Sequence, residues 1–348
     1  MNTKSNANIP DYTSYPKLFS PYKWYKPLLT ILIGAAVWFL LGSPFTFLTP
    51  ATLEAIKNGT SVAAAAKGGY DGFDAYSVLG ALANFGAIAM FLPAILIANR
   101  IVNARPFSSY SSSRGGFNWA AFFKSLGISV VLYVIPLAAF TLFTEPNTGN
   151  IRFTVFGFIV CTILCPLQCV GEEYLHRGFL MQTFGSWFKF PVIAIILQSV
   201  VFAAMHPYNW IGVANVFTIG IILGLCAYFT KGLEASCALH IVNNMTTFYL
   251  SGFGIGAVHT EQSIAEWIIP SCLALLFLGF MIFASKKLGW FSKVKKDDVA
   301  LFNEKIKNRK QKKQKRRVPQ KMSDSSSKIC HFKKDITSNE HNFPQNDV

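Results

Sequence analysis

Long apolar segments dominate this sequence and restrict the folds that it can adopt. A bilayer core about 30 Å thick is crossed by a helix of about 20 apolar residues. Helices also satisfy their own backbone hydrogen bonds in lipid, and no alternating pattern typical of strands is found. The sequence therefore predicts an all-α, polytopic transmembrane helical bundle of about eight spans. The predicted spans are residues 28–48, 76–98, 119–143, 153–184, 190–206, 211–230, 233–252 and 265–285.

The overall composition supports a membrane protein. Of the 348 residues, 52% are hydrophobic and only 14% are charged, whereas soluble domains average about 25% charged residues. The first 26 residues are too polar for a cleavable signal peptide, and the first apolar block is long enough to remain as a span. We therefore expect an integral, multi-pass membrane protein. A bacterial plasma membrane is a separate expectation, which composition alone does not give.

The distribution of Lys and Arg predicts the orientation of these spans. Cations gather in the N-terminal segment, in the loop after the second span and in the segment after the eighth span. All of these regions lie on one side if the spans alternate, and the opposite loops carry mainly carboxylates. Because cytoplasmic loops are enriched in Lys and Arg, both termini are predicted to be cytoplasmic.

The same features divide the chain into five predicted segments. They are a cytoplasmic N-terminal segment (1–27), three helices with their loops (28–152), a core with polar clusters (153–252), a last transmembrane helix (253–286) and a basic tail (287–348). Much of the net charge of +15 lies in the tail. A basic tail beside a last span is typically attracted to anionic lipid, so we expect no nucleic-acid partner and a largely disordered tail.

Three clusters of polar side chains interrupt the apolar helices of the predicted core. They are Glu172, Glu173, His176 and Arg177 in the fourth span, His206 at the end of the fifth, and His240, Asn243 and Asn244 in the seventh. Ionisable side chains in a membrane are costly and usually face the bundle interior or a water-filled cavity. At 1.5 Å rise per residue, the clusters reach similar depths on neighbouring helices. We expect them to share a cavity in the cytoplasmic half.

Helical spacing within the clusters indicates a hydrolytic chemistry. Glu173 and Arg177 are four residues apart and are expected to form an ion pair, while Glu172 points about 100° away, toward the cavity. A carboxylate and a histidine that converge on a water can form a general base. His240 and Asn244, also four residues apart, can donate hydrogen bonds to an oxyanion. One Glu and two His could instead hold a divalent metal such as zinc with a bound water.

The three clusters resemble the motifs of a known family. "EEYLHR" fits the EExxxR motif, "FAAMH" the FxxxH motif and "HIVNN" the HxxxN motif of the CPBP family, the CAAX-protease and bacteriocin-processing (Abi) proteins. The resemblance covers roughly residues 155–250. It implies an all-helical intramembrane endopeptidase fold, related to the prenyl proteases that trim CAAX C-termini. Glu173 and Arg177 would complete the first motif as supporting residues.

The resemblance also implies the catalytic roles. Glu172 would be the water-activating base, assisted by His206, and His240 with Asn244 would stabilise the oxyanion. One departure is His176, since the family usually has an aromatic residue before the arginine. The family is described both as metalloproteases and as metal-free glutamate proteases, and the absence of an HExxH motif leaves zinc without independent support.

The sequence thus predicts a CPBP-type intramembrane peptidase, either a glutamate or a metallo-endopeptidase. Its expected partners are the lipid bilayer and a peptide or membrane-protein substrate. The alternative is a non-enzymatic transporter, or a bacteriocin-immunity or regulatory protein, that uses the same polar cavity. Transporters often contain inverted repeats, and this sequence shows no clear internal repeat, which favours the peptidase.

Overall fold

The computed structural model describes residues 9–62, 75–256, 262–292 and 297–312. These ranges are mainly helical and contain no strand, only two isolated bridges between extended residues. The predicted all-α fold is therefore confirmed for the described residues. The chain divides into two compact units, residues 1–298 and 299–348, and a helix covers residues 298–312.

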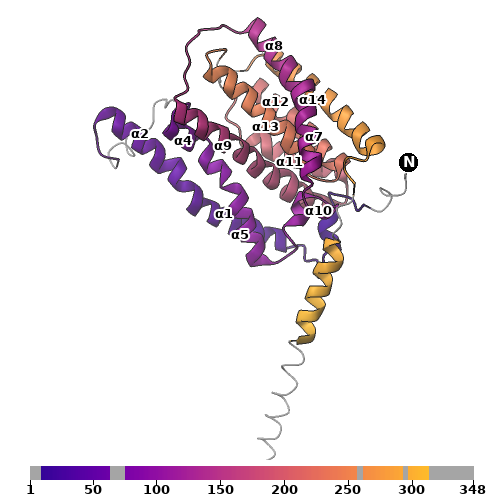
Figure 1. Ribbon diagram of the computed structural model, residues 1–348. Helices are drawn as coiled ribbons and strands as arrows, with labels where there is room; N and C mark the ends of the chain where they lie inside the picture. Colours follow the sequence, from indigo (N-terminus) through magenta and orange to yellow (C-terminus); the bar gives the residue numbers. More distant parts are fainter. Residues whose placement is uncertain (1–8, 63–74, 257–261, 293–296, 313–348) are drawn as a thin grey trace, which may run out of the picture. The chain divides into compact units, whose positions relative to one another are not determined.

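Figure 1 shows the helices of the first unit. The α-helices are α1 (Lys26–Ser43), α2 (Thr49–Asn58), α4 (Val78–Ala89), α5 (Phe91–Val102), α6 (Ser108–Ser111), α7 (Trp119–Ser129), α8 (Ile135–Thr144), α9 (Val155–Glu173), α10 (Gln182–Phe188), α11 (Pro191–Ala204), α12 (Trp210–Thr230), α13 (Glu234–Gly252) and α14 (Ile264–Phe283). A 3₁₀ turn, η1 (Tyr15–Leu18), precedes them, and π-helical segments form η2 (Pro44–Leu48), η3 (Val130–Val134), η4 (Tyr174–Met181) and η5 (Ala284–Leu288).

Within the described ranges, six continuous helices are long and apolar enough to cross a membrane. They are Lys26–Asn58, Val78–Val102, Trp119–Thr144, Val155–Phe188, Trp210–Thr230 and Ile264–Leu288. Each of the eight predicted spans is helical, but α11 has only 14 residues and α13 carries the polar HIVNN segment. The integral-membrane character is therefore supported by six of the eight predicted spans.

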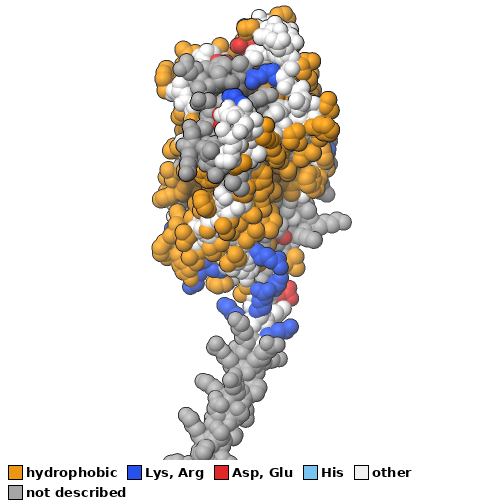
Figure 2. All heavy atoms as spheres, turned by 90° about the vertical axis from the view of Figure 1, so that its left-hand side faces the viewer, with side chains coloured by type: hydrophobic (Ala, Val, Ile, Leu, Met, Phe, Trp, Pro, Cys, Tyr) orange, Lys and Arg blue, Asp and Glu red, His pale blue; other side chains and the backbone are white. Residues whose placement is uncertain are grey.

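The surface of these helices is strongly apolar, as expected for contact with lipid. Leu40 is 71% exposed, Phe156 72% and Phe143 91%. Figure 2 shows hydrophobic side chains covering most of the middle of one face. Monomeric soluble proteins rarely expose such large continuous apolar areas.

Side-chain caps set where several of the helices begin. Side-chain oxygens of the N-cap residues accept backbone N–H groups of the first turn, which otherwise have no partner. The residues that do so are Ser77 for α4, Asn118 for α7, Thr154 for α9, Asn209 for α12 and Ser263 for α14.

Two left-handed residues turn the chain sharply at one end of the bundle. Lys189 (φ +66°) ends α10 and Lys231 (φ +61°) ends α12. A residue in this conformation at a helix C-terminus stops the helix and reverses the chain. The next helices, α11 and α13, therefore begin within three residues of these turns.

Helix α13 lies at the centre of the candidate core. It packs against α7, α9 and α12, while α9 also packs against α4, and α11 packs against α12 and η4 (Figure 1). Its N-terminal end is held by Arg114, whose guanidinium pairs with the Glu234 carboxylate, both side chains being fully buried. The other carboxylate oxygen of Glu234 accepts the Asn118 backbone N–H at 2.7 Å. This ion pair joins the start of α13 to the segment that leads into α7.

Candidate active site

The first polar cluster lies where α9 passes into the π-helical segment η4. Glu172 and Glu173 are the last residues of α9, and His176 and Arg177 lie in η4. All four are buried, with exposures of 4% for Glu172 and 0% for the others. Short π-helical segments are frequent at functional sites. Pro166 lies inside α9, ahead of this cluster.

Glu173 binds both the arginine of its own motif and the histidine of the third motif. Arg177 Nη1 donates to Glu173 Oε1 at 2.7 Å, so the predicted ion pair is confirmed. The same oxygen lies 2.8 Å from His240 Nδ1. Because a carboxylate can only accept, His240 Nδ1 carries the proton. The ring is thereby oriented with Nε2 toward Glu172, 3.4 Å from its Oε2.

Gln168 connects the Glu172 carboxylate to the third motif. Its Nε2 donates to Glu172 Oε2 at 2.6 Å, and its Oε1 accepts from Asn244 Nδ2 at 3.4 Å. Asn244 Oδ1 in turn accepts from Asn243, whose own side-chain oxygen accepts from the Tyr133 hydroxyl. Sequence reasoning missed Gln168. The sequence feature that could have identified Gln168 is an amide side chain one helical turn before Glu172, on the same helix face.

Phe202 lies among all three motifs. Its ring centroid is 4.9 Å from that of His176, 4.8 Å from His206 and 5.8 Å from His240. The Arg177 guanidinium lies 4.4 Å from the same centroid. Aromatic and cation–π contacts at these distances are favourable. The phenylalanine of the FxxxH motif therefore provides the surface against which these charged and titratable groups pack.

His206 lies outside the helix in which the sequence placed it. The predicted fifth span ran to residue 206, but α11 ends at Ala204, and His206 begins the connection to α12. The helix is two residues shorter than predicted because the chain turns before Pro207. A proline cannot continue a helix without a strained backbone. His206 Nδ1 lies 2.8 Å from the Phe202 carbonyl oxygen, and the side chain is half-buried.

The structure joins five of the six predicted site residues by hydrogen bonds and by the contact between His240 Nε2 and Glu172 Oε2. Glu172, Glu173, Arg177, His240 and Asn244 form one network, completed by Gln168. The sixth, His206, adjoins this network through the Phe202 ring.

The network carries an unequal number of charges. Glu172 and Glu173 supply two carboxylates, and Arg177 supplies one guanidinium. A buried charge is costly unless it is paired. The His240 Nε2 contact with Glu172 and the Arg177 contact with Glu173 are the pairings that the two carboxylates have in this cluster.

His176, the departure from the family pattern, packs as an aromatic residue would. Its ring meets Phe202 edge to face, with an interplanar angle of 71°. His176 Nδ1 lies 2.9 Å from the Glu172 carbonyl oxygen, one helical turn before it. The His176 side chain thus contacts the backbone of Glu172 and the ring of Phe202.

The residues of this site do not fit a metal ion in their present arrangement. Among the residues that the structure describes, no three His, Cys, Asp or Glu side chains are placed to hold one. Both ring nitrogens of His240 face carboxylates, and Glu172 Oε2 accepts from Gln168. The predicted alternative of one Glu and two His around zinc is not formed, because a zinc site needs at least three converging ligands.

The fold and this network together define an all-helical membrane protein with a buried Glu, His and Asn cluster. Residues 151–246 match the model of the Rce1-like family, described as Type II CAAX prenyl endopeptidase Rce1-like. This range contains all three motifs, and it confirms the predicted resemblance to the CAAX-protease family.

A curated relative and the solved structures complete the comparison. The uncharacterized protein YyaK of Bacillus subtilis (strain 168) is 27% identical over 168 residues, which is 44% of this chain and 55% of YyaK. The chain therefore spans about half the length of this relative. No solved structure gives a significant match.

Proposed function

We propose that this protein is an intramembrane endopeptidase that hydrolyses a peptide bond with a water activated by Glu172 and His206. The observation that supports it best is the network in which Glu173 orients His240, and Gln168 joins Glu172 to Asn244, within the matched range 151–246. This arrangement combines a base and two oxyanion donors at one buried place.

The proposed reaction begins with proton transfer from water. Gln168 already donates a hydrogen bond to Glu172 Oε2. The other carboxylate oxygen, Oε1, is therefore the one that takes the water proton. With His206 Nδ1 donating to the Phe202 carbonyl, its Nε2 lone pair can accept from the same water. The water oxygen then forms a bond to the substrate carbonyl carbon, and the carbonyl becomes an oxyanion.

The second half of the reaction uses the third motif. Doubly protonated His240 donates its Nε2–H, and Asn244 donates an Nδ2–H, to the oxyanion. Such donors are most effective when they are already fixed before the charge develops. The intermediate collapses as Glu172 returns its proton to the leaving nitrogen, so that a carboxylic acid and an amine are released. Each step uses protein groups alone.

The proposed substrate is a peptide or the terminus of a membrane protein that approaches through the bilayer. We also propose a bacterial plasma-membrane location with both termini in the cytoplasm, on the basis of the Lys and Arg distribution. The basic segment after residue 287 is proposed to lie near anionic lipid.

Comparison of membrane proteomes tests the proposed function. Membranes of a bacterial host that contains the natural substrates, with wild type or Glu172→Ala at equal levels, are compared by quantitative analysis of protein termini. We expect a specific new terminus only with wild type, because Glu172 supplies the base. A membrane-permeant chelator should leave that product unchanged. Identical termini in both membranes would contradict the peptidase and favour a transport or binding role for the site.

Gln168→Met is expected to lower kcat by roughly 10- to 100-fold with little change in KM. Loss of a hydrogen bond to a charged group costs about 1.5–3 kcal/mol, and each 1.4 kcal/mol is a factor of about ten in rate. Methionine keeps the volume but cannot orient Glu172. Steady-state kinetics on the identified substrate give kcat and KM. Gln262→Met, outside the network, is the control. A rise in KM with unchanged kcat would show that Gln168 contacts substrate instead.

A further inference from the structure

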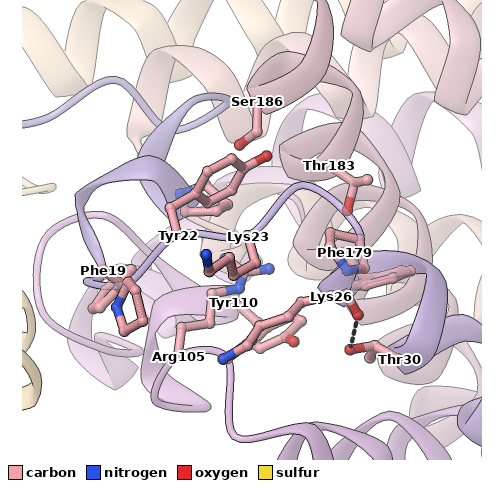
Figure 3. Close-up of a pocket in the computed structure, with 14 residues that line it drawn as sticks. Phe19, Tyr22, Lys23, Lys26, Thr30, Arg105, Tyr110, Phe179, Thr183 and Ser186 are labelled. Atoms are coloured by element: carbon pink, nitrogen blue, oxygen red, sulfur yellow. Dashed lines mark hydrogen bonds between the residues drawn. The ribbon is translucent and has the colours of Figure 1, made fainter. Parts of the chain in front are cut away.

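A cationic pocket lies where three candidate membrane spans end. Lys26 begins the span that contains α1, Val102 ends the second span, and Phe188 ends the fourth. Between these ends the pocket is lined by Lys23, Lys26, Arg105, Tyr22, Thr183 and Ser186 (Figure 3). The positions of the span ends place it at the boundary between the apolar belt and water.

Among the residues that the structure describes, Arg105 and Lys26 of this pocket donate side-chain hydrogen bonds only to neutral groups. No Asp or Glu is among its lining residues. Arg105 is 6% exposed, and its guanidinium donates to the Gln182 side chain and to the Gly178 carbonyl. Lys26 Nζ donates to the Asn103 carbonyl at 3.3 Å. A charge removed from water without a counter-charge is unfavourable, so an anion in the pocket would stabilise it.

Two hydroxyl groups of the pocket, those of Tyr22 and Ser186, lie next to each other and have no hydrogen bond of normal geometry to any other residue that the structure describes. Ser186 is 3% exposed. Figure 3 shows the Tyr22 hydroxyl directed toward Ser186. Buried polar groups without partners are rare in proteins. The oxygens of a phosphate group can accept from both hydroxyls.

The N-terminus of α1 adds to the positive potential. The 18-residue helix begins at Lys26, and its N-cap, Tyr25, provides no side-chain cap. Lys26 N–H is bonded to the Lys23 carbonyl and Pro27 has no N–H, so α1 contributes mainly through its dipole, which favours negative charge at this end. Lys26 and Thr30 of this helix line the pocket. The helix dipole thus acts together with the cations and the two hydroxyls.

We propose that this pocket binds the phosphate group of an anionic lipid headgroup. The neighbouring surface favours a lipid over a free anion, because Trp24 is 64% exposed, Tyr25 44% and Leu28 45% at the start of the span. Trp and Tyr are enriched at membrane interfaces, where the ring meets the headgroup region. The acyl chains would then lie along the exposed apolar side of α1. This site is separate from the proposed active site and does not depend on its activity.

Binding to the purified full chain in a neutral detergent tests the proposal. Short-chain phosphatidylglycerol, short-chain phosphatidylcholine and inorganic phosphate are each titrated, and thermal stability and affinity are measured. We expect phosphatidylglycerol to stabilise the wild type more than either other probe does. Since each lysine near a lipid surface contributes about fivefold in affinity, Lys23→Gln with Lys26→Gln should weaken binding about 30-fold.

Two further variants separate this site from general charge effects. Lys57→Gln with Lys124→Gln removes the same charge from exposed positions in α2 and α7 and should leave phosphatidylglycerol affinity unchanged. Ser186→Ala removes only a hydroxyl. It should weaken phosphatidylglycerol binding by a smaller factor than Lys23→Gln with Lys26→Gln does. If both pairs of lysine substitutions weakened phosphatidylglycerol binding equally, the proposal that the pocket binds the headgroup would be wrong. Equal binding of inorganic phosphate and phosphatidylglycerol would overturn the lipid assignment.

Discussion

Glu172→Gln is expected to lower kcat for peptide cleavage by about 10²- to 10⁴-fold, the contribution that a positioned general base usually makes. The amide is the same size as the carboxylate and can still accept from Gln168 Nε2, which lies 2.6 Å from Oε2 in the wild type. It cannot take a proton from water. The protein should therefore remain folded and inserted while the chemical step fails. Single-turnover kinetics on the substrate identified by terminal proteomics measure this loss.

Two further variants define the role of Glu172. Glu172→Asp keeps the charge but withdraws the carboxylate by one methylene, and it should also lose most activity because reacting groups must be placed closely. Glu266→Gln, which changes a carboxylate in the capping box of α14, should retain wild-type kcat. Nearly full activity of Glu172→Asp would indicate that Glu172 compensates a charge and is not the base.

Arg177→Leu is expected to abolish detectable cleavage and to lower the free energy of unfolding by about 3–5 kcal/mol. The change leaves Glu173 as a buried carboxylate without its guanidinium partner. It also removes the Arg177 contacts with the Gly220 carbonyl of α12 and the Phe202 ring of α11. Since Glu173 also holds His240 Nδ1, the orientation of the imidazole should be lost. Denaturant unfolding in detergent and kcat of the folded fraction measure the two effects separately.

The matched control is a second buried arginine. Arg114→Leu breaks the fully buried pair with Glu234 and should cost similar stability, because that pair also has no solvent exposure. Its folded fraction should keep a kcat close to wild type. Glu173→Gln combined with Arg177→Leu removes both charges and should recover part of the stability but none of the activity. Equal loss of kcat in the folded fractions of Arg114→Leu and Arg177→Leu would contradict a specific role for Arg177.

Much of the architecture could be predicted from local patterns. All eight predicted spans are helices, because an apolar block of sufficient length can satisfy its backbone in lipid only by coiling. The Glu173–Arg177 pair was predicted because its two side chains are one helical turn apart. The end of the fifth helix was predicted two residues too late, since hydropathy continues to His206 although the chain has already turned before Pro207.

The contacts between helices could not be predicted in the same way. His240 lies 67 residues from Glu173, yet its Nδ1 is 2.8 Å from the Glu173 carboxylate, and the two positions meet only because α13 packs against α9. In the sequence, Gln168 is one polar residue in an apolar helix. Its role is evident only from its hydrogen bond with Asn244, which lies on another helix. The same is true of the cationic pocket, whose lining residues come from three separate parts of the chain.

By itself, the sequence determined a helical membrane protein with three motifs on neighbouring segments, because hydropathy and one-turn spacing act within a single helix. Only the tertiary structure decided that Glu173 orients His240, that Gln168 joins Glu172 to Asn244, and that Phe202 packs among the histidines. The physical reason is that a hydrogen bond depends on distances of tenths of an ångström. Such distances between helices are set by the packing of the whole bundle.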